Sequence, residues 1–141
     1  MKSRIAWHQD VAFVAESGSG HALVVDGSPD HGGRNLGPRP MELVLMGLGS
    51  CASFDVVTIL KKQRQEVTGC VCELDATRAD AVPAIFTAVA LHFVVTGRNL
   101  DPLKVERAVS LSAEKYCSAS KLFEAAGVAL THRVTCQNSL D

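Results

Sequence analysis

The first third of the chain alternates between apolar and polar residues with a period of two, which is typical of β-strands. Three such stretches cover residues 4–9, 11–17 and 21–27, and they are rich in β-branched and aromatic residues. The sequence S-G-S-G at residues 17–20 supplies a hairpin turn between the second stretch and the third. The pattern therefore predicts an antiparallel meander of three strands.

A glycine-rich segment follows at residues 27–39, which hold four glycines and two prolines. This composition favours turns over helix or strand. We expect a loop here, and loops of this length in small domains are often functional or mobile.

An unusually apolar stretch begins at Pro40, a residue that suits the first position of a helix. The helix is expected to run to about Gln65, with basic residues near its C-terminus, where the helix dipole favours cations. Its segment 41–60 is long enough to raise the question of a membrane span. However, it contains Glu42 and Asp55, which are costly inside a bilayer. The sequence predicts a soluble helix that is buried on nearly all sides, and no association with a membrane.

Period-two alternation returns after this helix. Residues 68–78 place two cysteines, a leucine and an alanine on one face, and residues 85–96 form a second long strand. Residues 128–135 are predicted to form the last strand.

Two helices are predicted between these last two strands. Asp101 followed by Pro102 is a strong helix start, and residues 118–126 form a further helix that ends at Gly127. The face of the first helix that is expected to be buried carries Val105, Ala108, Val109 and Ser112. The predicted order is βββ-α-ββ-αα-β, an α+β fold in a single domain that spans residues 1–141.

Composition narrows the functional classes. The 141 residues weigh 15.0 kDa and carry a formal net charge of −1, so the chain lacks the basic footprint of a nucleic-acid-binding protein. The opening residues M-K-S-R-I-A-W-H-Q-D turn polar before an apolar signal region forms, and we expect a cytoplasmic protein. The five cysteines are an odd number, which argues against a secreted disulfide framework.

Cys51 lies in the apolar helix, with Asp55 one helical turn later and Gly47 one turn earlier. A reactive thiolate there needs a cation nearby, and a neighbouring carboxylate works against it. The alternative is a small core residue, because free cysteine is among the most buried residue types.

Cys117 has a different setting, 66 residues further along the chain. A helix that begins at Ser118 puts Cys117 at its N-terminus, where free N–H groups and the helix dipole favour a thiolate. Such a thiol suits thiol–disulfide exchange. The alternative is a capping residue that only satisfies backbone donors.

The remaining candidates favour structural roles. Cys70 and Cys72 resemble half of a soft-metal site to which Cys136 could add a third thiolate, but their spacing on a strand favours core cysteines, and no metal is expected. His8, His92 and His132 lie in or near predicted strands, and His31 lies in the loop without a partner that the sequence names.

Two motifs together resemble the OsmC/Ohr superfamily, and within it the OsmC-like branch of the YhfA type. The first is P-x-E-L-x-L-x-x-x-G-S-C at residues 40–51, followed by D-V-V-x-I-L-K-K at residues 55–62. The second is E-K-Y-C-S at residues 114–118, and the segment L-H-F-V-V-T-G-R-x-L at residues 91–100 adds to it. The resemblance covers nearly the whole chain.

The resemblance implies an intertwined homodimer with central helices wrapped by sheets and a site at the subunit interface. It implies that Cys51 is the peroxidatic nucleophile and that Cys117 resolves its sulfenic acid. The substrates would be organic hydroperoxides and, less efficiently, hydrogen peroxide, in an antioxidant stress response. No cofactor is expected beyond an external dithiol or thiol reductant.

The sequence departs from better-studied members of the superfamily at two points. They place a glutamate directly after the proline, where this chain has Met41, and Glu42 follows one position later. They also carry an arginine in the N-terminal hairpin, where this chain reads S-G-S-G-H; Arg34 or Arg39 is the substitute that the sequence offers. These departures leave open a non-peroxidase protein that holds a small hydrophobic or electrophilic ligand at the dimer interface. A persulfide or sulfur-transfer role is a third reading.

Overall fold

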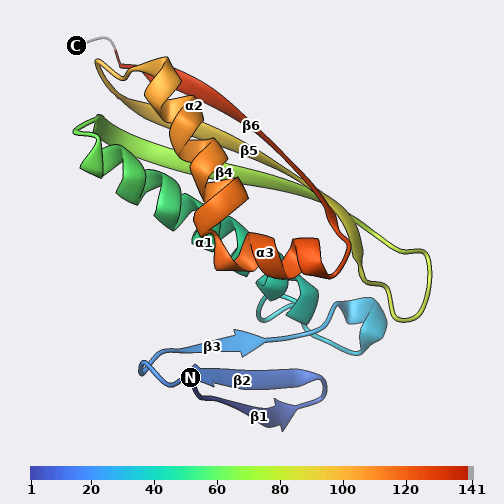
Figure 1. Cartoon of the computed structure of the whole chain (residues 1–141). Coiled ribbons are helices and arrows are strands. Elements are labelled where there is room, and N and C mark those ends of the chain that lie inside the picture. Colours follow the sequence, from blue (N-terminus) through green and yellow to red (C-terminus); the bar gives the residue numbers. More distant parts are fainter. Residues whose placement is uncertain (140–141) are drawn as a thin grey trace. The chain divides into compact units, whose positions relative to one another are not determined.

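The computed structural model describes residues 1–139 of the chain. These residues divide into two compact units, the first Met1–Val44 and the second beginning at Leu45. The elements of both are labelled in Figure 1.

The first unit contains the predicted meander. Strands β1 (Ser3–Gln9), β2 (Ala12–Ser17) and β3 (Ala22–Val25) form an antiparallel sheet in the order β1-β2-β3. The prediction of three strands is confirmed, and the third strand is shorter at both ends than the pattern suggested.

The segment predicted as a loop contains one short 3-10 helix, η1 (Pro29–His31). Asp26 organises the segment, since its buried carboxylate accepts hydrogen bonds from the backbone N–H groups of Gly27, Arg34 and Leu36 at 2.7, 3.1 and 3.1 Å. A single buried acidic side chain therefore holds both ends of the turn, which the glycine and proline content alone did not indicate.

Helix α1 (Pro40–Lys62) begins at the predicted proline and ends three residues before the predicted end. Arg64 adopts a positive φ of 57°, which is incompatible with continued right-handed helix. By length and composition this helix could cross a membrane, with a mean hydropathy of 1.9 over its most apolar 18 residues. The same test is passed by core helices of soluble proteins.

Only one face of α1 is buried within the chain. The buried residues recur about once per turn and are Leu48, Gly49, Ala52, Val56 and Leu60. Met46 and Phe54 remain 57% and 72% exposed. The prediction that the helix is buried on nearly all sides is therefore wrong for the single chain, because one sheet covers only one face of a helix.

The second unit is built on a second three-stranded sheet. It consists of β4 (Glu66–Arg78), β5 (Phe86–Arg98) and β6 (Ala129–Asn138), with β4 antiparallel and β6 parallel to the central β5. Figure 1 shows α1 and the two later helices lying along this sheet. A Cβ at Gly49 would come within 2.6 Å of Leu74 Cδ1, so the glycine permits close approach of α1 to β4.

Alternate residues of β5 form the centre of the core. Val89, Leu91, Phe93 and Val95 are 0–5% exposed and face the helices. The predicted alternation in β4 is also confirmed, with its two cysteines, Leu74 and Ala76 turned inward. The α+β fold and the predicted element order are therefore those of the structure.

Two helices precede the last strand. Helix α2 (Pro102–Leu111) starts at Asp101, whose carboxylate accepts a hydrogen bond from the Leu103 N–H at 3.0 Å. Helix α3 (Ser118–Ala125) is followed by Gly127 at a φ of 81°. Both predicted helix ends are thus confirmed. Between the helices lies one π-helical turn, η2 (Ser112–Tyr116), which the sequence did not predict.

Candidate functional site

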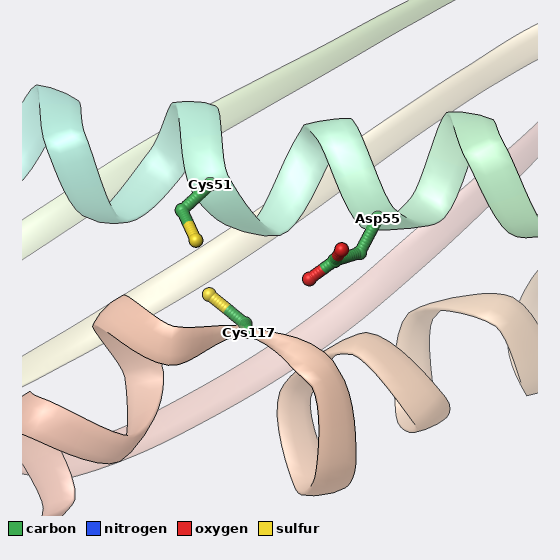
Figure 2. A group of neighbouring side chains, drawn as sticks. All are labelled: Cys51, Asp55 and Cys117. Carbon is green, nitrogen blue, oxygen red and sulfur yellow. The ribbon is translucent and has the colours of Figure 1, made fainter.

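The fold brings Cys51 of α1 and Cys117, at the start of α3, face to face. The two Sγ atoms and a carboxylate oxygen of Asp55 all lie within 4.8 Å of one another. Figure 2 shows the sulfurs pointing toward each other, with the Asp55 carboxylate beside them. Cys51 and Asp55 share one face of α1 because they are four residues apart.

Cys117 is held in place by hydrogen bonds to its backbone and its side chain. Its Sγ accepts from the Ser120 N–H at 3.3 Å, and its own N–H donates to the Ser112 carbonyl at 2.9 Å. Ser112 is fully buried, and its hydroxyl donates to the carbonyl of Ala52, the neighbour of Cys51, at 3.0 Å. The π-helical turn thereby connects the two cysteine-bearing elements.

Ser112 is a site residue that the sequence analysis identified only as part of a buried helix face. A buried serine inside an apolar stripe is the signal that points to it, because buried hydroxyls require partners. The partner itself lies 60 residues away and was not predictable from local spacing.

The electrostatic setting of Cys117 differs from the expectation. Burial raises the pKa of the Cys117 thiol, hydrogen bonds from Ser120 act in the opposite direction, and the adjacent Cys51 raises the pKa further. Cys117 does occupy the N-cap of α3, as predicted. The helix start therefore orients the thiol, but complete burial outweighs its effect on the thiolate.

Asp55 is the third member of the cluster. Its Oδ2 has no contact with solvent and no hydrogen-bond partner among the residues that the structure describes. Burial raises the pKa of its carboxyl group. Within residues 45–139 it forms no ion pair.

Arg34 and Arg39, which the sequence offered as a source of positive charge near Cys51, have acceptors inside the first unit. Arg34 Nε lies 3.7 Å from Asp10 Oδ2, and Arg39 Nη1 donates to Asn35 Oδ1. Glu42 Oε2 accepts from the backbone N–H of Arg39 at 2.9 Å, so this carboxylate caps the start of α1.

The other three cysteines face the interior of the second unit. Cys70 and Cys136 lie on either side of Val95 in the sheet, and burial raises the pKa of each thiol. Burial raises the pKa of Cys72 to about 11. Among residues 1–139, these three do not form a group able to hold a metal, and the one such group is Cys51, Asp55 and Cys117.

Three of the histidines have side-chain partners, and one of them is His21, which pairs with Ser19 Oγ at 3.2 Å. His92 lies between Thr135 Oγ1 at 2.9 Å and Glu73 Oε2 at 3.3 Å, and His31 pairs with Ser28 Oγ at 2.8 Å. His92 is thus a satisfied strand histidine, as predicted.

A pocket of about 210 Å³ opens behind the site. It is lined on one side by Ser112 and Ser120 and on the other by Leu91, Phe93 and His132. Neither Cys51 nor Cys117 lines it. The pocket is smaller than most small-molecule sites, which span about 300–1,000 Å³.

Comparison with known proteins gives one family. The sequence model of the family described as OsmC-like protein matches residues 31–133. Protein YhfA of Escherichia coli K12 is 46% identical over 132 residues, which cover 94% of this chain and 95% of YhfA.

Solved structures share the fold. A protein of Aquifex aeolicus superimposes with a TM-score of 0.85 at 27% identity, over 99% of this chain and 97% of that chain. The organic hydroperoxide resistance protein OhrB of Bacillus subtilis superimposes with a TM-score of 0.62 at 18% identity, over 96% of this chain and 98% of that chain. At that identity the second likeness concerns the fold alone.

Proposed function

The chain belongs to the OsmC-like family, and on this premise we propose that it reduces organic hydroperoxides and, less efficiently, hydrogen peroxide. Cys51 is the nucleophile and Cys117 the resolving thiol. The observation that carries the proposal is the approach of the two sulfurs, which come from different elements, to within 4.8 Å. OhrB of Bacillus subtilis, which shares the fold, is an organic hydroperoxide resistance protein.

In the first step the Cys51 thiolate attacks the terminal oxygen of the hydroperoxide, and the O–O bond breaks. The sulfur becomes a sulfenic acid, and the departing alkoxide takes a proton to become an alcohol. Cys51 is only half-buried in the single chain, whereas Cys117 is fully buried.

In the second step the Cys117 sulfur attacks the sulfenic sulfur, a disulfide forms and water leaves. An external dithiol then reduces this disulfide and is itself oxidised to a disulfide. Cys117 suits the resolving role because it is fully buried and fixed toward Cys51 by Ser112 and Ser120. A protected thiol with a raised pKa reacts poorly with peroxide itself.

We also propose that the protein is a homodimer in which the second copy covers the exposed face of α1. Met46 and Phe54 expose large apolar side chains on this helix. Large apolar side chains exposed on one helix are expected where another protein surface covers that helix. The family resemblance makes a second copy the expected occupant.

The test is mass spectrometry of the reduced protein after a brief pulse of substoichiometric cumene hydroperoxide, with hydrogen peroxide as a comparison. We expect rapid formation of the Cys51–Cys117 disulfide. Cys51→Ser should abolish peroxide consumption, and Cys117→Ser should accumulate a sulfenic acid on Cys51. Cys136→Ser, which changes a cysteine outside the pair, should behave like the wild type.

Slow oxidation scattered over all five cysteines would refute the peroxidase proposal. The ligand-binding alternative would then be tested by a ligand-dependent rise in melting temperature without peroxide consumption.

A further inference from the structure

We propose that the reduced protein binds one Zn²⁺ ion per chain through Cys51 Sγ, Cys117 Sγ and a carboxylate oxygen of Asp55. This goes beyond peroxide reduction, because it assigns a second state to the same thiol pair. Cys51 and Asp55 come from one face of α1, and Cys117 comes from the N-cap of α3, so the ion would join two elements of the second unit.

The geometry of the three atoms suits a tetrahedral ion. Zinc holds thiolate sulfur at about 2.3 Å and carboxylate oxygen at about 2.1 Å, so neighbouring ligand atoms lie roughly 3.5–3.8 Å apart. Here all three atoms are already within 4.8 Å of one another. Metal binding would require small rotations about the χ angles of the three side chains to close the remaining gap.

The type of ligand selects the ion. Two thiolates exclude Mg²⁺ and Ca²⁺, which take oxygen ligands, and favour Zn²⁺ and related soft or borderline metals. Three protein ligands leave a fourth position for water or an incoming thiol, as in open zinc sites.

An independent observation points to a missing partner for Asp55. Asp55 Oδ2 is shielded from solvent and has no hydrogen-bond partner within residues 1–139, although buried carboxylate oxygens are normally paired. Figure 2 shows the Asp55 carboxylate beside the two sulfurs, and one of its oxygens lies within 4.8 Å of both. A divalent cation bound by all three groups would give the carboxylate a partner, and its charge of +2 would balance the charges of the two thiolates.

Zinc binding and disulfide formation exclude each other, because the sulfurs either ligate the ion or bond to one another. When zinc binds, each thiol releases one proton. When a hydroperoxide oxidises the two thiolates, two electrons pass to the O–O bond and two protons are taken up. The disulfide, an alcohol and water are then formed, and the ion is released. The pair would thus act as a redox-sensitive zinc site.

The experiment titrates the reduced, metal-free full-length protein with Co²⁺ under anaerobic conditions. Co²⁺ replaces Zn²⁺ in tetrahedral sites and reports thiolate ligation by a near-ultraviolet charge-transfer band. We expect this band to saturate at one Co²⁺ per chain and to disappear when Zn²⁺ is added. Cys51→Ser and Cys117→Ser should each weaken the band strongly, and Asp55→Asn should lower the affinity roughly tenfold or more.

Cys136→Ser is the matched control, since it removes an inward-facing thiol outside the cluster and should leave the titration unchanged. The proposal is overturned if reduced wild-type protein shows no band with excess Co²⁺. It is equally overturned if the band survives in both Cys51→Ser and Cys117→Ser. Circular dichroism of each variant separates loss of binding from loss of folding.

The peroxide pulse on Asp55→Asn keeps the two proposals distinguishable, because this variant retains both thiols. Disulfide formation in Asp55→Asn beside a wild type that binds no Co²⁺ would refute the zinc site alone. A Co²⁺ band without peroxide-driven disulfide formation would refute the peroxidase alone.

Discussion

The pairing of Cys51 with Cys117 predicts a lower reduction potential in the folded protein than in the unfolded chain. The two residues are 66 positions apart. Closing a loop of this length in an unfolded chain costs about 4.4 kcal/mol at 25 °C in the chain-entropy treatment. A fold that already holds the sulfurs close removes this cost, and the disulfide in turn stabilises the fold by the same free energy.

This free energy can be expressed as a potential. For a two-electron couple, 1.4 kcal/mol corresponds to about 30 mV, so 4.4 kcal/mol corresponds to about 90 mV. The sulfurs must still approach from within 4.8 Å to bonding distance, and the strain of that approach subtracts from the gain. We therefore expect the native potential to lie about 40–90 mV below that of the unfolded chain, which matches the 2–4 kcal/mol typical of disulfides.

The chain contains its own control. Cys70 and Cys136 are also 66 positions apart, so the unfolded chain closes both loops at the same entropic cost. In the fold they lie on β4 and β6, opposite Val95 of the intervening β5. Two strand spacings separate their Cα atoms by roughly 9.6 Å, beyond the reach of about 7 Å that a disulfide allows.

The assay equilibrates the protein with glutathione buffers of defined ratio, with and without guanidinium chloride, and quantifies each disulfide by mass spectrometry. In denaturant the two pairs should form disulfides alike. Without denaturant, Cys51–Cys117 should become more stable and Cys70–Cys136 should disappear. A native Cys51–Cys117 potential equal to or above the unfolded value would refute the inference that the fold holds these sulfurs in reach of each other.

Three further predictions concern the packing and chemistry around the site. Ser112→Ala removes the hydrogen bond to the α1 backbone. In urea unfolding it should lower the free energy of unfolding by about 1 kcal/mol, and it should slow disulfide formation. The exposed control Ser118→Ala should change the free energy of unfolding by less than about 0.5 kcal/mol. Cys72, whose pKa is raised from 9.0 to about 11, should be alkylated by iodoacetamide about 100-fold more slowly at pH 8 than an unperturbed thiol, and unfolding should abolish the difference. Gly49→Ala should destabilise the protein by about 1 kcal/mol, because the clash with Leu74 exceeds the gain in helix propensity, and Leu74→Val should reduce that penalty in a double-mutant cycle.

Local sequence signals predicted the helix starts and turns well. The Asp101 cap, the proline at the start of α1 and the left-handed Gly127 all depend on the conformational preferences of one or two residues. Such preferences act wherever the residue stands, so they can be recognised without knowing the tertiary structure. The same is true of the period-two pattern of β4, whose inward face the sequence identified.

The features that were not predicted depend on distant partners or on competing effects. The π-helical turn at Ser112–Tyr116 accompanies a hydrogen bond between a serine and a carbonyl 60 residues away. The exposed face of α1 is about as apolar as its buried face. Hydropathy alone therefore could not distinguish the two faces, and the predicted burial of the helix was too extensive. The direction of the pKa shift of Cys117 was missed because burial, which opposes the helix N-terminus, is a property of the whole fold. The meeting of the two sulfurs was expected from the family resemblance and not from spacing.

Charge balance links the two proposed states of the site. The cluster brings together three ionisable side chains, two thiols and one carboxyl group, and within residues 45–139 Asp55 forms no ion pair. Ionising all three groups of the reduced cluster is therefore energetically costly. Protonation, a bound divalent cation and disulfide formation each reduce that charge by a different route. Oxidation removes two of the three ionisable groups at once, because neither sulfur of a disulfide can carry a thiolate charge. A bound zinc ion would lower the electrostatic cost of the thiolates without oxidation. A cluster built in this way should therefore respond to metal and to peroxide in competition, and zinc-loaded protein should form the Cys51–Cys117 disulfide more slowly than metal-free protein.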